Sequence, residues 1–150
     1  MIALFVPACR ATGLQFRQDA AFRILAPQDR ATVTIPFMLQ WTDPANGLEN
    51  GLRYGVFVDR PPPPLWGKVR RTLGRSRPCL LPDAPSPQCL REEGVYLTSD
   101  HSLSIEVLPP RFGSPRGLED VHEITVVPLS PSGERLGESA AHVIVRIQRA

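Results

Sequence analysis

Apolar and polar side chains alternate most clearly between Thr32 and Thr42. Every second residue in this stretch is large and apolar, namely Val33, Ile35, Phe37, Leu39 and Trp41. A period of two over this length predicts a β-strand with one face buried in a core. Because Pro36 has no amide hydrogen to donate, we expect a bulge or a sheet edge at that position.

Shorter alternating segments recur along the rest of the chain. We expect six more strands, at residues 22–24, 53–59, 95–98, 103–107, 121–129 and 139–147. Prolines and glycines fill the segments between them, and no helical period of 3.6 residues is sustained. The pattern therefore predicts an all-β fold, in which two antiparallel sheets pack face to face and enclose Trp41.

The last two strands are expected to form a hairpin with the three-residue loop 131–133. Pro131 suits the first central position of a type I turn, and Gly133 suits the left-handed position that follows. In this register Ser130 faces Glu134 across the ladder. A bulge in either strand would change this register.

Counting outward from that loop places His122 opposite His142. Two imidazoles that face each other across a ladder lie close enough to bind a metal ion together. Glu123 points to the opposite face from His122 and would not complete such a site. A metal-binding protein that uses the two histidines is thus one alternative, and a surface or packing pair is the other.

The composition narrows the class of protein. The chain has 150 residues with 17 Pro and 11 Gly, which fits one domain of short segments and excludes a helical bundle. A net charge of +2 indicates no nucleic-acid partner. No apolar run approaches the roughly 18 residues of a membrane-spanning helix. We divide the chain into an N-terminal segment (1–9), a tether (10–20) and one domain (21–150) with a surface insertion at 60–91.

Positive charge is concentrated in this insertion. Four consecutive prolines, Pro61–Pro64, favour polyproline II, and residues 60–77 hold six Arg or Lys side chains and no acid. Basic groups beside an aromatic ring are able to hold an anionic polymer or lipid headgroup. The candidates for such a contact surface are Trp66, Arg70, Arg71 and Arg75. The alternative is a solvated basic loop with Trp66 folded onto the sandwich.

Two of the three cysteines lie in the same insertion. Cys79 and Cys89 are separated by nine residues, among which prolines and Asp83 favour turns. A small disulfide-closed loop fits this spacing and an oxidising compartment outside the cytosol. Two buried free thiols are the alternative.

The N-terminal residues 1–8 are uncharged and largely apolar up to Cys9, which predicts that residues 1–9 are the end of an export signal. The segment Val6-Pro7-Ala8-Cys9 resembles the lipobox of bacterial lipoproteins. This resemblance implies a thioether-linked diacylglycerol on Cys9 and a mature chain that begins there, with a translation start upstream of Met1. The alternative is an N-terminal strand with an unmodified Cys9.

Two longer stretches carry a second resemblance. ILAPQDRATVTIPFMLQW (24–41) and RYGVFVDR (53–60) resemble the first strands of immunoglobulin-like and fibronectin type III-like modules of bacterial surface proteins. With the lipobox-like start, the chain resembles small actinobacterial-type lipoproteins that carry one such domain.

This second resemblance implies an immunoglobulin-like β-sandwich without enzymatic activity or cofactor, anchored by lipid to the outer face of the cytoplasmic membrane. The implied partners are the membrane, an anionic polymer of the cell envelope or another surface protein. A protein partner could also add a strand to an exposed sheet edge.

Catalytic signals are few. Ser99, Asp100 and His101 have the side chains of a hydrolase triad, but neighbours in sequence seldom converge in space. The chain contains neither a G-x-S-x-G nucleophile elbow nor a phosphate-binding glycine loop. We therefore expect the three residues to form a turn, with hydrolase activity as an unfavoured alternative.

Overall fold

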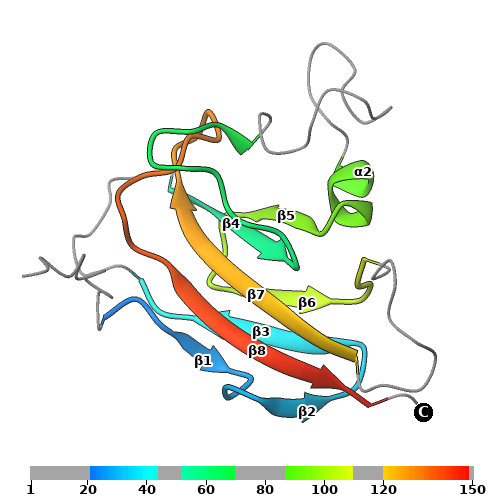
Figure 1. Ribbon diagram of the computed structural model, residues 1–150. Coiled ribbons are helices and arrows are strands. Elements are labelled where there is room, and N and C mark those ends of the chain that lie inside the picture. Colours follow the sequence, from blue (N-terminus) through cyan, green and yellow to red (C-terminus); the bar gives the residue numbers. More distant parts are fainter. Residues whose placement is uncertain (1–20, 44–51, 70–86, 110–119, 149–150) are drawn as a thin grey trace, which may run out of the picture.

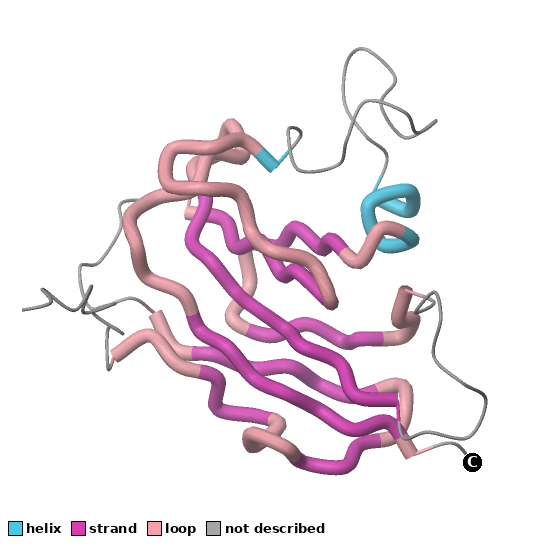
Figure 2. Tube along the Cα trace, in the orientation of Figure 1, coloured by secondary structure: helices cyan, strands magenta, loops and turns pink. Residues whose placement is uncertain are grey.

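The strands form two sheets packed face to face (Figures 1 and 2). The computed structural model describes residues 21–43, 52–69, 87–109 and 120–148. Within these ranges the first sheet has the order β1-β3-β6, with β1 at Ile24–Ala26, β3 at Phe37–Trp41 and β6 at Ser102–Ile105. The second has the order β2-β8-β7-β4-β5, with β2 at Ala31–Val33, β8 at Ala141–Ile147, β7 at Asp120–Leu129, β4 at Arg53–Val58 and β5 at Val95–Thr98. The predicted all-β sandwich is confirmed.

The long alternating stretch is divided between the two sheets. β2 pairs with β8 in parallel, whereas β3 pairs with β1 and β6 in antiparallel orientation. The break falls at Pro36, which cannot donate a backbone hydrogen bond to a ladder. Our prediction of one strand over residues 32–42 was therefore wrong, because the side chains keep their period of two while the backbone changes partner.

The core between the sheets is apolar. It contains Leu39, Trp41, Tyr54, Val56, Val58, Ile124, Val126, Val143 and Val145, all of them buried. The Trp41 and Tyr54 rings meet edge to face with centroids 5.4 Å apart, and Phe22 stacks on Tyr54 at 6.3 Å. The predicted burial of Trp41 is confirmed.

A second apolar cluster lies on the outer face of the five-stranded sheet. Phe57, Val95, Val127 and Leu129 point to this face and are covered by Val69 and by Leu90 of a short helix, α2 (Pro87–Glu92). Gly55 faces the same layer, and a Cβ there would stand 2.7 Å from a ring carbon of Phe57. The two described ends of the predicted insertion thus cover the sheet.

The helix itself was missed by the sequence reasoning, which expected only surface loop over residues 60–91. Its six residues are too few to show a helical period, so packing against β5 decides its conformation. None of the helices in the described ranges is long and apolar enough to span a membrane. The tether, the N-terminal segment and Cys9 lie outside the described residues.

Candidate functional site

Trp66 is the most exposed large apolar residue in the described part of the chain, with 67 % of its surface accessible. Its backbone has a φ of 61°, in the left-handed region that side chains other than glycine seldom adopt. The Trp66 amide donates to the Arg135 carbonyl at 3.2 Å, and the Arg135 amide donates to the Gly67 carbonyl at 2.9 Å. The backbone that carries the indole is therefore held by hydrogen bonds.

The side chain of Arg135 secures the same segment. Its Nη1 atom donates to the Pro63 carbonyl at 3.0 Å, and Nη2 donates to the Glu138 carbonyl at 3.3 Å. Burial lowers the pKa of Arg135 below its ordinary value, and the Glu138 charge opposes this shift. A half-buried guanidinium thus ties the polyproline segment to the loop after β7.

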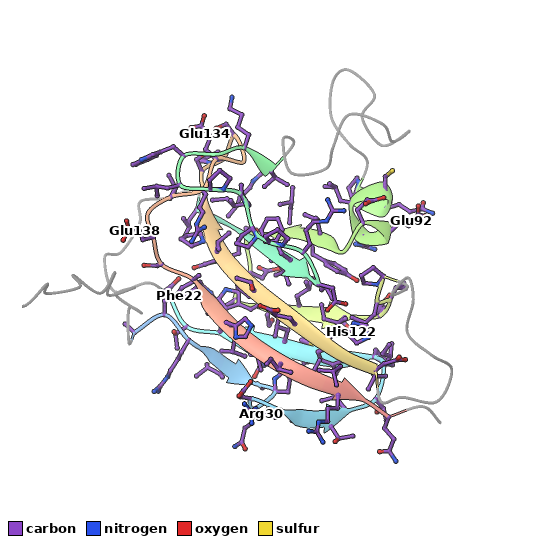
Figure 3. The ribbon with its side chains drawn as sticks, viewed as in Figure 1. Phe22, Arg30, Glu92, His122, Glu134 and Glu138 are labelled. Carbon is purple, nitrogen blue, oxygen red and sulfur yellow. The ribbon has the colours of Figure 1, made fainter. Side chains whose placement is uncertain are left out.

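Leu65 and Lys68 are close to Trp66 in the sequence. Leu65 is 39 % exposed, and the Lys68 ammonium lies 3.6 Å from the Glu134 carboxylate. Figure 3 places Glu134 at the end of the sandwich opposite His122. We call Leu65, Trp66 and Lys68 the Trp66 surface. The alternative in which Trp66 folds onto the sandwich is contradicted, whereas Arg70, Arg71 and Arg75 lie outside the described residues.

His122 is buried, with 4 % of its surface exposed. Its Nδ1 atom lies 2.5 Å from Oδ2 of Asp59, which follows β4. The other carboxylate oxygen of Asp59 accepts a hydrogen bond from the Glu123 amide at 3.0 Å. The imidazole therefore belongs to a buried pair that joins β4 to β7.

His142 lies on the opposite face of β8, where it is exposed and bonds to Glu123 at 2.9 Å. In the observed ladder His122 faces Val145, and His142 faces Thr125. The expected pairing of the two histidines was wrong. They do not form a metal site together.

An irregular segment after the hairpin loop explains the error. The loop has the expected geometry, since the Ser130 amide donates to the Glu134 carbonyl at 2.8 Å and Gly133 has a φ of 81°. Leu129 still pairs with Arg135, but Val126 pairs with Ala141, which shifts the register by three residues. Gly137, at a φ of 67°, lies in the segment that makes this shift.

Ser99, Asp100 and His101 form a turn between β5 and β6, as expected. The Asp100 amide donates a hydrogen bond to the Thr98 hydroxyl at 3.0 Å. The His101 imidazole forms its hydrogen bond with Asp43 and not with Asp100. The three side chains do not assemble a triad. The hydrolase alternative gains no support from this turn.

Asp43 instead joins two other side chains. Oδ1 of Asp43 accepts hydrogen bonds from the Tyr54 hydroxyl and from Nε2 of His101. The Tyr54 bond is the main reason why the pKa of Asp43 lies below its usual value of 3.8, and burial raises the pKa of Tyr54. Sequence reasoning missed this cluster because 58 residues separate Asp43 from His101 and no local pattern links them.

Within the described residues no group of three or more His, Cys, Asp or Glu side chains is placed to hold a metal ion. Cys89 lies on α2, whereas Cys79 is outside the described ranges, so their pairing stays a prediction.

Comparisons with protein-family models, with curated proteins and with solved structures returned no match. Inferences about its function therefore rest on the residues and geometry of this chain.

Proposed function

We propose that this protein is a non-enzymatic interaction module of the cell envelope, with an immunoglobulin-like sandwich that binds an anionic polymer through the Trp66 surface. Immunoglobulin-like domains place their first, second, fourth and fifth strands in one sheet and their third, sixth and seventh in the other. Within the described residues the smaller sheet has three strands, so the fourth has no counterpart there. The order β1-β3-β6 and the neighbours β4, β7 and β8 support this type. β2 and β5 extend the second sheet at its two edges.

The exposure of Trp66 is the observation that carries the proposal. An indole that is 67 % exposed gains only a small part of the free energy of burial, and a left-handed backbone at a residue other than glycine costs about 1–2 kcal/mol. Stability alone thus does not favour tryptophan at this position. Tryptophan and arginine are the side chains most enriched at binding hot spots.

Charge supports an anionic partner. Residues 60–77, which include Trp66, hold six basic side chains and no acid. Arg60 pairs with Glu93 and Lys68 with Glu134, so the charge that supports the proposal is that of Arg70, Arg71, Arg75 and Arg77. Positive groups attract a polyanion over several ångströms, and an aromatic face adds contact area. A lipid anchor on Cys9 would keep the domain beside such polymers.

Binding to a purified anionic wall polymer tests the Trp66 surface. We expect Trp66→Ala to weaken binding at least about tenfold. Replacement of Arg70, Arg71 and Arg75 by Ser should also weaken binding. The difference in affinity from the wild type should become smaller as the salt concentration rises. Met38→Ala is the matched apolar control, because Met38 is also exposed but lies on β3. Unchanged affinity in both test variants would reject the proposal.

A charge control separates a local surface from net charge. Replacement of Arg23, Arg53 and Arg91 by Ser removes the same charge from other parts of the molecule. We expect this variant to keep most of its affinity for the polymer. An equal loss in both triple variants would mean that net charge, and not the Trp66 surface, determines binding.

The anchor is tested by the intact, non-reduced mass of protein purified from the membrane fraction of its own host. A chain that begins at Cys9, heavier by a diacylglycerol and lighter by the two hydrogens of a disulfide, supports the lipoprotein and Cys79–Cys89 proposals together. A chain that keeps Met1 and three free thiols overturns both.

A further inference from the structure

Three side chains with metal-binding atoms meet at one end of the sandwich. Oδ1 of Asp43 accepts a hydrogen bond from the Tyr54 hydroxyl and bonds to Nε2 of His101. The Tyr54 hydroxyl also lies 3.0 Å from Nε2 of His101, so each of the three atoms is within hydrogen-bond reach of the other two. A carboxylate, a phenol and an imidazole therefore converge on one point.

The spacing of these atoms is close to that in the coordination shell of a metal ion. Neighbouring ligands about 2.1 Å from an octahedral ion stand about 3 Å apart. The Tyr54 oxygen and the His101 nitrogen already have this separation, and the Asp43 oxygen lies closer to both. Because the Asp43 side chain is 63 % exposed, a small outward movement of its carboxylate is enough to give all three atoms the spacing of metal ligands.

The cluster is open to solvent on one side and fixed by the core on the other. The His101 side chain is 50 % exposed, so an ion has access from solvent beside it and Asp43. The buried Tyr54 ring packs edge to face on Trp41 and stacks on Phe22. The Trp41 amide donates to the His101 carbonyl at 3.0 Å, which ties the backbone of His101 to the strand that leads to Asp43. The fold therefore positions the donor atoms before any ion arrives.

The donor set selects the kind of ion. Besides Asp43 and His101 it includes a tyrosine, so it is not one of the groups built from His, Cys, Asp and Glu alone. Carboxylate and phenolate oxygens are hard ligands, imidazole suits iron, copper and zinc, and the set contains no thiolate to favour a soft ion. Tyrosine is also a known protein ligand of iron. This combination suits ferric ion best.

An ion must displace the phenol proton to bind Tyr54. Burial raises the pKa of Tyr54, so the hydroxyl keeps its proton in the metal-free protein. A bound cation stabilises the phenolate, and a trivalent ion does so more strongly than a divalent one. Coordination thus forms an iron–oxygen bond and releases the hydroxyl proton to solvent, and it requires neither an oxidant nor a reductant.

From this convergence we infer that Asp43, Tyr54 and His101 form a binding site for a ferric ion. The carboxylate, the phenolate and the imidazole nitrogen occupy three positions around the ion, and water or a small chelating anion occupies the others. None of the three residues belongs to the Trp66 surface or to the N-terminal segment. Ferric binding and polymer binding can therefore fail separately.

The colour of tyrosinate-bound iron provides the test. Tyrosinate bound to Fe(III) absorbs visible light, and the chain has two tyrosines, so the band can be assigned to one residue. We expect titration of the whole protein with ferric nitrilotriacetate to produce a visible band that saturates at one ion per chain. Tyr54→Phe should abolish the band, whereas Tyr96→Phe, which removes the other phenol, should keep it. No saturable band, or a band that survives Tyr54→Phe, would overturn the site.

Variants of the other two ligands complete the test. Asp43→Asn and His101→Gln should each weaken ferric binding at least about tenfold, since loss of even an outer partner of a ligand costs about 10–100-fold. His142→Gln is the matched control, because His142 is also an exposed histidine that bonds to a carboxylate. If Tyr54→Phe does not fold, resonance Raman spectra of the wild type and of Tyr96→Phe still show whether tyrosinate is a ligand and which tyrosine supplies it. An equal loss of affinity in His142→Gln, or saturable binding of Zn(II) without a ferric band, contradicts the inference.

Discussion

The Tyr54 hydroxyl donates a hydrogen bond to the carboxylate of Asp43, and this bond joins the two sheets of the sandwich. Tyr54 lies on β4 of the five-stranded sheet, and Asp43 follows β3 of the three-stranded sheet. Nε2 of His101 bonds to the same carboxylate oxygen and lies 3.0 Å from the Tyr54 hydroxyl. The cluster therefore stabilises one end of the sandwich, and it is sensitive to pH.

Tyr54→Phe should destabilise the protein by about 1 kcal/mol at neutral pH, since the ring remains and one hydrogen bond is lost. Tyr54 lowers the folded pKa of Asp43, so this stabilisation is present above the unfolded value of 3.8 and is lost as the pH falls through the folded pKa. Urea unfolding at neutral and strongly acidic pH measures the difference. Tyr96→Phe is the control, because the Tyr96 hydroxyl donates to a carbonyl, that of Val107. A difference between wild type and Tyr54→Phe that does not shrink in acid would contradict this assignment.

Alkaline titration should show no tyrosine ionisation near the ordinary pKa of 10. The chain has two tyrosines, and burial raises the pKa of both Tyr54 and Tyr96 in the folded state. The unfolded state therefore releases protons first, and stability falls as the pH rises above 10.0. Tyrosinate absorbance and circular dichroism, recorded together, should change in one step. Ionisation near pH 10 with the β-sheet signal intact is the opposing result.

Asp59→Ala should cost about 1–3 kcal/mol of stability, because it leaves the buried His122 imidazole without its acceptor. Asp59→Asn should cost less, since its side-chain oxygen still accepts a hydrogen bond and asparagine tolerates the φ of 53° at this position. His142→Ala is the exposed control and should change stability by less than about 0.5 kcal/mol. Denaturant midpoints of the three variants measure these differences in stability. Equal losses of stability in all three would exclude a specific role for the Asp59–His122 pair.

Trp66→Gly should be more stable than Trp66→Ala by roughly 1 kcal/mol, because glycine adopts the φ of 61° without strain and alanine does not. Both variants should lose the same affinity for the anionic polymer, since both lack the indole. Unfolding curves and binding isotherms measured on the same samples test the two statements separately. A Trp66→Ala variant as stable as Trp66→Gly would show that the left-handed backbone relaxes.

Arg135→Met should loosen the Trp66 surface without removing any of its side chains. The substitution keeps an apolar stem but removes the hydrogen bonds to the carbonyls of Pro63 and Glu138. We expect faster hydrogen exchange at the Trp66 amide and weaker polymer binding. Unchanged exchange at that amide would mean that the backbone bonds alone hold the segment.

Local patterns predicted much of the secondary structure. The alternation over residues 53–59, 95–98 and 121–129 located β4, β5 and β7 within one or two residues. Turn chemistry predicted the loop at Ser130–Glu134, where Gly133 has the expected positive φ. These features depend on a few neighbouring residues, so a short window of sequence is sufficient to recognise them.

Pairings between residues far apart in the chain could not be predicted from local patterns. The bond between Asp59 and His122 spans 63 residues, and the shift of three residues between β7 and β8 arises in a segment with no strong local signal. The candidate site was likewise predictable from the sequence only in part. Trp66 was recognisable from its basic surroundings, whereas its exposure depends on backbone bonds to Arg135.

The sequence by itself determined the all-β class, most strand positions, the hairpin loop and the concentration of positive charge around Trp66. Only the tertiary structure decided which sheet β2 and β3 join, which face His142 occupies and how β7 and β8 are registered. The physical reason is that strand propensity and side-chain period act between near neighbours. Partner choice, register and exposure depend instead on the burial and hydrogen bonding of segments far apart in the chain.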